Sequence, residues 1–354
     1  MNIITKNRKF KNFLSININK QKEKQMNNKD YKKLTPKEKA MLKAETLKAS
    51  REKVTQETLD SILAARKNNT MPKWFKSWSD MGLHRNHEGT PYKGINQFTL
   101  MLFGSTYTSP YWLSYRQAVQ ILKAKPKSSI KGKGVHIYHY VDKKFKGEVI
   151  GTKDGEEITE DRVIKVLALA GTVFNASLFE GLPSHYYNTP DKKAATRERL
   201  EDLDAVFNTY CKKTKVKLLE SGSGAFYRPS NDSVNMPSFD SFKDNVSYYS
   251  VLAHEIAHST MTKERCNRSG NNKFGSPKYA FEELVAELSS MFFMIESGHQ
   301  AAPKDDNIAY LDNWLNLLKD HKDAIFKACS LANQAVNFIQ DKGQMNLNTE
   351  SAAA

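Results

Sequence analysis

The segment "YYSVLAHEIAHST", residues 248–260, places two histidines four positions apart, with a glutamate directly after the first. On an α-helix, His254 and His258 lie one turn apart on the same face, so both imidazoles can bind one tetrahedral ion. Glu255 lies about 100° further round the helix, beside the open coordination position. A carboxylate in that place can accept a proton from a metal-activated water and pass it to a leaving amine. The segment therefore predicts a helix that carries a catalytic Zn²⁺ site.

A third ligand is expected in "YAFEELVAELSSMFF", residues 279–293, because a catalytic zinc keeps three protein ligands and one open position. An apolar stripe recurs at helical spacing in this segment, formed by Phe281, Leu284, Val285, Leu288 and Phe292. Glu283 and Glu287 lie at i and i+4 on another face. We predict Glu283 as the ligand and Glu287 as a carboxylate that orients an imidazole. Periodicity leaves Glu282 open as the alternative ligand.

An ordinary solvated helix face is the alternative for each of these two segments taken alone. His and Glu side chains on such a face form hydrogen bonds with water and need no metal. The two segments occur on successive predicted helices, however, and together they supply a complete ligand set. Their combination therefore favours the metal site.

The segment "GAFYRPSNDSVNMPS", residues 224–238, predicts a β-hairpin with its turn at Ser230-Asn231-Asp232. Some peptidases bind a peptide in extended form against an edge strand beside the metal, and this hairpin precedes the proposed metal helix. A hairpin that only completes the core is the alternative. In the first case Tyr227 and Arg228 are candidates to polarise a carbonyl or to bind a carboxylate.

The remaining pattern predicts an α+β protein whose two halves differ in character. Thr35, Pro36 and Glu38 form a capping box that begins a helix ending near Arg66, and only the second half of this helix carries an apolar stripe. Residues 71–182 are rich in aromatics and glycine, which indicates a mixed α+β domain. We expect a helix near 113–124 and a loop insert at the acidic stretch 151–162. From about residue 194 the pattern is mainly helical, with a short strand in "KVKLLE".

Basic and aromatic residues alternate between Arg116 and Lys146, where nine Lys or Arg accompany a single acidic residue. In "GVHIYHYV", residues 134–141, strand alternation places His136, Tyr138 and Tyr140 on one face. Bases of single-stranded nucleic acid stack on such rings for about 1 to 3 kcal/mol each, while lysines contact the phosphates. We therefore predict Tyr138 and Tyr140 as a stacking platform. The alternative is that both tyrosines pack under a helix.

Three other histidines have weaker indications of a role. His139 lies on the apolar face of the same strand, which is typical of a hydrogen-bonded core histidine. His84 and His87 are three apart in a polar loop, but the sequence offers them no nearby cysteine or carboxylate. We therefore do not expect a second metal site there.

The formal net charge of +15 is concentrated in residues 1–53, which hold 16 Lys and Arg against 5 Asp and Glu. Such a segment is typical of a solvated arm, or of one that attracts nucleic acid. Three cysteines without a paired spacing indicate a reducing cytoplasm. No apolar run has the length of a signal peptide or of a membrane span, so neither secretion nor a membrane is expected. Translation from Met26 instead of Met1 is an open alternative.

Between about residues 54 and 342 the chain resembles the ArdC-type antirestriction proteins of plasmids and phages. The motifs that resemble their single-stranded-DNA-binding domain are "PYKGIN" (91–96), "YWLSYRQA" (111–118), "KGKGV" (131–135) and "VFNASLFEGLP" (173–183). The motifs that resemble their zincin-like metallopeptidase domain are "AFYRPSNDSVNMP" (225–237), residues 248–260, "FGSPKYAFEELVAEL" (274–288) and "YLDNWLNLLK" (310–319). The resemblance implies a DNA-binding domain at 54–185 and a mainly helical metallopeptidase domain with a small β-sheet at 186–345. The basic extension at 1–53, expected to be largely disordered or helical, falls outside the resemblance.

The resemblance also implies roles for single residues. His254, His258 and Glu283 correspond to the metal ligands and Glu255 to the general base. A DNA-contacting surface is implied at Lys93, Asn96, Trp112, Arg116, Lys131 and Lys133. The family continues the zinc helix with Trp-Thr-Gly, whereas this chain has Ser259-Thr260-Met261, which alters the expected wall of the cleft.

Two hypotheses for function follow. In the first, the protein is a cytoplasmic zinc metallopeptidase with an attached single-stranded-DNA-binding domain, made by a mobile element to protect incoming DNA, and it acts on a protein or peptide substrate. In the second, it coats single-stranded DNA and its zinc site is structural or vestigial. A metal-dependent nuclease is less favoured, because nucleases commonly gather more carboxylates around Mg²⁺. The sequence indicates neither a protein substrate nor an oligomeric state.

Overall fold

The computed structural model describes residues 33–72, 74, 82–153, 156–188, 195–268, 276–302 and 307–345. By its internal contacts the chain divides into two units, residues 1–49 and residues 50–354. Most of the basic extension expected at the N-terminus, Met26 included, lies outside the described residues.

Helix α3 (Pro36–Lys67) confirms the predicted long N-terminal helix. The backbone N–H of Thr35 donates to Glu38 Oε2 at 2.8 Å, and the N–H of Glu38 donates to Thr35 Oγ1 at 3.3 Å. This reciprocal capping box pairs two backbone donors that the helix itself leaves unpaired. The buried residues of α3 all fall from Ser50 onward, as the apolar stripe predicts.

The N-terminal half of the second unit, residues 50–188, combines helix with sheet. Helix α5 (Gly94–Gly104) is followed by a three-stranded antiparallel sheet of order β1-β4-β3 and a two-stranded sheet of β2 and β5. The strand bounds are Trp112–Leu113 for β1, Lys125–Pro126 for β2, Val135–Lys153 for β3, Glu156–Asn175 for β4 and Phe179–Glu180 for β5. The helix predicted near 113–124 is a short π-helix, η1 (Arg116–Ile121), and two 3₁₀ turns follow β4 and β5.

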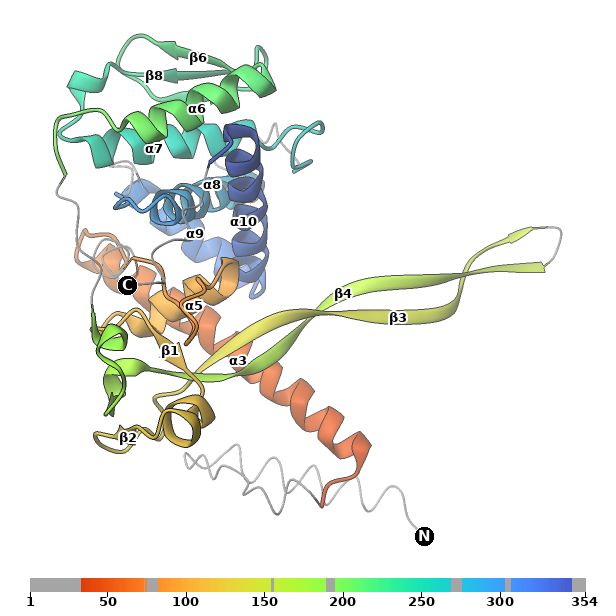
Figure 1. Ribbon diagram of the computed structural model, residues 1–354. Coiled ribbons are helices and arrows are strands. Elements are labelled where there is room, and N and C mark those ends of the chain that lie inside the picture. Colours follow the sequence, from red (N-terminus) through yellow and green to blue (C-terminus); the bar gives the residue numbers. More distant parts are fainter. Residues whose placement is uncertain are drawn as a thin grey trace. The chain divides into compact units, whose positions relative to one another are not determined.

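Strands β3 and β4 form one long antiparallel ribbon (Figure 1), whose register runs from Val135 opposite Val173 to Lys153 opposite Glu156. The described residues of the acidic stretch, 151–153 and 156–162, are therefore strand, and the predicted loop insert is wrong. The β-branched residues Thr152, Ile158 and Thr159 favour an extended backbone. The many charged residues around them make the sequence pattern resemble that of a loop.

The C-terminal half, residues 195–345, is mainly helical. Its helices are α6 (Glu201–Thr214), α7 (Asn245–Ser259), α8 (Pro277–Glu296), α9 (Asn307–Asp320) and α10 (Ala324–Gly343). A small sheet of order β6-β8-β7 comprises β6 (Lys217–Glu220), β7 (Phe226–Arg228) and β8 (Ser233–Met236), with β6 parallel and β7 antiparallel to β8. The predicted short strand, hairpin and α+β class are confirmed. Helix α7 contacts both this sheet and α8 (Figure 1).

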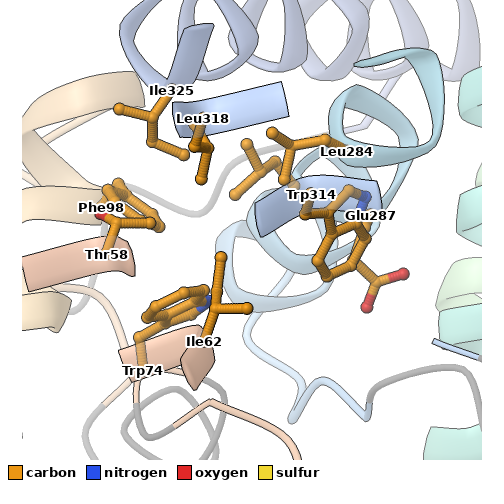
Figure 2. A pocket seen from close by; sticks show the side chains of 10 residues that line it. Thr58, Ile62, Trp74, Phe98, Leu284, Glu287, Trp314, Leu318 and Ile325 are labelled. Atoms are coloured by element: carbon orange, nitrogen blue, oxygen red, sulfur yellow. The ribbon is translucent and has the colours of Figure 1, made fainter. Parts of the chain in front are cut away.

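Apolar side chains from both halves meet around a small cavity (Figure 2). Its walls are Thr58, Ile62, Trp74 and Phe98 from the N-terminal half, and Leu284, Glu287, Leu288, Trp314, Leu318 and Ile325 from the C-terminal half. Ile62, Phe98 and Trp314 are each no more than 1% exposed. The two halves therefore share a packed core, and one of its walls carries a carboxylate, that of Glu287.

Among the described helices, none is both long enough and apolar enough to cross a bilayer. The three cysteines, all within described segments, form no disulfide.

Candidate metal centre

Helices α7 and α8 bring His254, His258 and Glu283 together. The Nε2 atoms of the two imidazoles lie 3.1 Å apart. The Oε2 atom of Glu283 lies 3.5 Å from Nε2 of His254, and its Oε1 atom lies 3.5 Å from Nε2 of His258. All three side chains are buried. Local sequence determines where both helices begin: Asp244 caps the start of α7, and Ser276 with Pro277 begins α8. His254 and His258 are four residues apart on α7, and Glu283 lies on the surface of α8 that faces them.

The spacing of these groups is compatible with one divalent ion. Ligands about 2.0 to 2.1 Å from a tetrahedral centre lie roughly 3.3 Å from one another. The two Nε2 atoms are 3.1 Å apart, each lies 3.5 Å from a different oxygen of Glu283, and one ligand atom from each of the three residues lies within 4.8 Å of the other two. Within the described part of the chain, these three residues form the one group of His, Cys, Asp or Glu with ligand atoms close enough to hold a metal. Two imidazoles and one carboxylate suit zinc, and they also accommodate other first-row metals.

The electrostatics of the site centre on His254 and Glu283. Burial by itself would lower the pKa of His254, but the carboxylates of Glu283, Glu287 and Glu255 outweigh it and raise this pKa to about 10. Burial would raise the pKa of Glu283, but the two histidines outweigh it and lower this pKa to about 2. Negative charge is thus concentrated where a cation would bind.

Two further glutamates face the outer nitrogens of the imidazoles. Nδ1 of His254 lies 3.1 Å from Glu287 Oε2, within hydrogen-bonding distance. Nδ1 of His258 lies 3.5 Å from Glu282 Oε1. The guanidinium of Arg268 donates to both oxygens of Glu282, at 3.1 and 2.7 Å. Glu282 therefore lies at the outer edge of His258, whereas Glu283 faces the inner nitrogens of both histidines.

Glu255 is only 2% exposed and follows the first histidine on α7. Its negative charge contributes to the raised pKa of His254. The Glu255 carboxylate is thus near enough to His254 to act on it electrostatically.

Sequence patterns gave no indication of a network around Arg265. Its guanidinium donates to the Ser259 carbonyl at the end of α7, to the Thr214 carbonyl and to the carboxylate of Asp232. The hydroxyl of Tyr227 donates to Asp232 Oδ1 at 2.8 Å. Arg265 thereby connects the hairpin turn, through Asp232, to the end of α7. The Tyr227 hydroxyl supports this connection by its hydrogen bond to Asp232. Isolated residues in loops have no periodicity that would have revealed them.

Several residues expected to contact DNA are instead structural. Trp112 is fully buried, and its indole N–H donates to Nδ1 of His84 at 3.0 Å. Tyr138 is 3% exposed, and its hydroxyl lies 2.6 Å from that of Ser50 on α3. The side chain of Asn96 bonds to both the N–H and the C=O of Tyr138. The predictions of DNA contact by Trp112 and of stacking on Tyr138 are therefore wrong, because both rings are buried in the core. Asn96 is half-buried and holds β3 in place, and its contact with DNA stays a prediction.

The other residues of that predicted surface are accessible. Tyr140 is 53% exposed, and Arg116 and Lys131 are also exposed, while Lys133 is half-buried. Lys93 is exposed as well, but its ammonium lies 3.4 Å from the carboxylate of Glu296 on α8.

His139 and His84, two histidines outside the candidate metal centre, differ in their environments. His139 is exposed, so its predicted place in the core is wrong; it follows the buried Tyr138 and points to the opposite face of β3. His84 is buried, and burial lowers its pKa to about 4, so it remains a neutral acceptor for Trp112. It thus belongs to the core and not to a metal site.

Two family models match the chain. Residues 52–174 match the N-terminal domain of anti-restriction factor ArdC, and residues 205–331 match a zincin-like metallopeptidase. The chain therefore carries both kinds of domain, in this order.

Similar proteins extend these matches. A protein of Sinorhizobium fredii described as uncharacterized protein y4eC is 30% identical over 81% of this chain and 90% of its own length. A DNA primase TraC of Escherichia coli is 29% identical over 84% of this chain, which spans 27% of the primase. The metal-free crystal structure of antirestriction protein ArdC from plasmid R388 has a TM-score of 0.60 and 32% identity over 83% of this chain and 97% of ArdC. Its Mn(II)-bound structure has a TM-score of 0.59, 30% identity and coverage of 82% and 97%. This chain therefore belongs to the family of ArdC-type antirestriction proteins.

Proposed function

We propose that this protein is a metal-dependent peptidase of the antirestriction type that also binds single-stranded DNA. The observation that carries the proposal is the convergence of His254, His258 and Glu283 on one point, with Glu255 on the adjoining position of the same helix. We infer that Zn²⁺ is the resident ion, since two imidazoles and one carboxylate form a typical ligand set of catalytic zinc.

When bound, the ion would supply a polarised water and a Lewis-acid contact to the carbonyl of a peptide. His254, His258 and Glu283 are the residues that would hold it. Glu255 takes the proton from water as the water oxygen bonds to the carbonyl carbon, and it gives the proton to the amine nitrogen as the C–N bond breaks. Glu287 accepts the Nδ1 proton of His254 and so keeps Nε2 free to bind.

We assign single-stranded DNA to the N-terminal half. The match to the ArdC N-terminal domain and the similarity to a DNA primase support this assignment. A further support is that Arg116, Lys131 and Tyr140, all between positions 116 and 140, have exposed side chains. Cationic side chains neutralise phosphates, and an exposed ring offers a surface for a base. The same residues would allow the protein to coat an incoming strand.

The variant Glu255→Gln tests whether catalysis is involved. It keeps the size of the side chain and the metal ligands, but the amide cannot accept a proton. We expect bound zinc and DNA binding to match the wild type, whereas protection of transferred DNA from restriction in a conjugation assay is lost. The matched control is Glu264→Gln, a change at an exposed glutamate that should protect as the wild type does. If Glu255→Gln protects fully, the protein acts as a coat for single strands and the peptidase proposal is wrong.

A further inference from the structure

The two histidines of the candidate metal centre differ in how their outer nitrogens are bound. Nδ1 of His254 has a hydrogen-bond partner in Glu287, at 3.1 Å. Nδ1 of His258 is buried and has no hydrogen bond within the described structure, although Glu282 Oε1 lies 3.5 Å away. A buried ring nitrogen without a partner is costly, so it indicates a bond that forms in another state of the site.

Glu282 is held in place by Arg268 and is not free to rotate. Two guanidinium nitrogens of Arg268 donate to the Glu282 carboxylate, at 3.1 and 2.7 Å. This two-point geometry fixes the plane of the carboxylate as well as its position. The side chains of Glu282 and Arg268 are 9% and 3% exposed. The positive charge of Arg268 keeps the buried carboxylate of Glu282 ionised without any metal.

Arg268 is in turn tied to the end of the histidine helix. Its guanidinium donates to the Ala257 carbonyl at 2.9 Å and to Thr260 Oγ1 at 2.7 Å, on either side of His258 in the sequence. Because Glu282 lies on α8, Arg268 links the two helices that carry the candidate ligands on the side of His258. Thr260, the one position at which Ser259-Thr260-Met261 matches the family's Trp-Thr-Gly, contributes a hydroxyl to this link.

From this geometry we propose that Arg268 and Glu282 act as a positioning pair for His258: Glu282 accepts the Nδ1 proton when Nε2 binds the metal, and Arg268 holds Glu282 away from the ion. The proposal rests on the metal site proposed above. It makes Glu282 the counterpart of Glu287, so that each imidazole has its own carboxylate and Glu283 is the single carboxylate ligand. A shift of about half an ångström brings the 3.5 Å contact within hydrogen-bonding distance.

Titration of the full chain with Zn²⁺ tests this assignment. We expect Glu282→Gln to bind one ion per chain with affinity lower by about 10- to 100-fold, the range typical of changes to an outer carboxylate of a zinc ligand. Glu283→Gln should lose binding at the concentrations that saturate the wild type. Arg268→Lys, which keeps the charge but loses the paired contact, should weaken binding in the same direction. Glu264→Gln, at an exposed position, should bind as the wild type does.

A spectroscopic measurement separates positioning from a general structural effect. In the zinc-loaded wild type we expect a slowly exchanging, downfield Nδ1 proton of His258 in the NMR spectrum, and in Glu282→Gln we expect it to shift upfield or exchange, with the Nδ1 proton of His254 unchanged. If Glu282→Gln leaves both zinc affinity and this proton unaltered, the positioning pair is wrong while the metal site stands. If Glu282→Gln abolishes binding and Glu283→Gln does not, Glu282 is the ligand. If the wild type binds no zinc, the metal site itself fails.

Discussion

The carboxylate of Glu287 lies 3.1 Å from Nδ1 of His254, and the same side chain lines the apolar cavity that Ile62 bounds from the N-terminal half. One residue therefore contacts a candidate metal ligand and also lines the cavity shared by the two halves, where Figure 2 shows it. This contact connects packing of the N-terminal half with the geometry of a metal ligand.

Ile62→Ala should destabilise the protein and also weaken zinc binding. Ile62 is 1% exposed, and truncation of a buried isoleucine costs about 2 to 5 kcal/mol in the free energy of unfolding. Looser packing beside Glu287 should then lower zinc affinity severalfold. Denaturant unfolding and zinc titration measure the two effects, and Leu63→Ala, at a neighbour that is 41% exposed, is the control. Equal zinc affinity in Ile62→Ala and the control would show that the core and the site are independent.

Zinc should stabilise the folded chain, because an ion that binds only the folded state shifts the unfolding equilibrium. At a free zinc concentration 100 times the dissociation constant, the gain in the free energy of unfolding is about 2.7 kcal/mol. Removal of the metal by a chelator should reverse it. Thermal or denaturant unfolding with and without zinc checks this effect, and an equal gain in Glu283→Gln would contradict the assigned ligand.

Asp232→Asn should change how stability depends on pH. Burial would raise the pKa of Asp232, but the hydrogen bonds from Arg265 and Tyr227 outweigh it and hold this pKa below its ordinary value of 3.8. A carboxyl group with a depressed pKa contributes stability that is complete above its unfolded pKa and is lost as pH falls through its folded pKa. The wild type should thus be more stable than Asp232→Asn near neutral pH, and the difference should shrink below about pH 4.

Asparagine suits this test, since the backbone φ of residue 232 is +50° and Asn adopts that conformation readily. Denaturant unfolding at several pH values measures the effect. A difference between wild type and variant that stays constant down to pH 3 would exclude the Arg265 network as its source.

Lys131→Ala should weaken binding of single-stranded DNA about equally for all sequences and reduce the salt slope of the affinity by about one. Lys319→Ala, at an exposed lysine of α9, should leave the slope unaltered. Titrations of a labelled oligonucleotide at two or more salt concentrations give both values. Identical slopes for the two variants would place the DNA-binding surface elsewhere.

The parts of the site that local spacing determines could be predicted from the sequence. His254 and His258 face the same way because the helical period requires it, and the i, i+4 spacing of Glu283 and Glu287 places both carboxylates on one face of the second helix. Glu283 is the ligand that the sequence favours, but periodicity leaves Glu282 open, since the position of Glu282 depends on Arg268, a residue in a loop without periodicity.

The predicted DNA-binding surface, in contrast, could not be located from local spacing. Strand alternation places Tyr138 and Tyr140 on one face, yet it does not tell which stretch of that face another element covers. Ser50 on α3 and Phe326 on α10 cover Tyr138, and both lie far from it in sequence, whereas Tyr140 lies beyond them and is exposed. Contacts between distant segments decided between core and surface.

Anomalous diffraction at the zinc edge, from crystals of the zinc-loaded protein, tests the central claim most directly. The account predicts one strong peak about 2.0 to 2.2 Å from Nε2 of His254, Nε2 of His258 and a carboxylate oxygen of Glu283, with Glu282 still bound to Arg268. A peak coordinated by Glu282, a peak at the Nδ1 atoms, or zinc bound only away from α7 and α8 would contradict it.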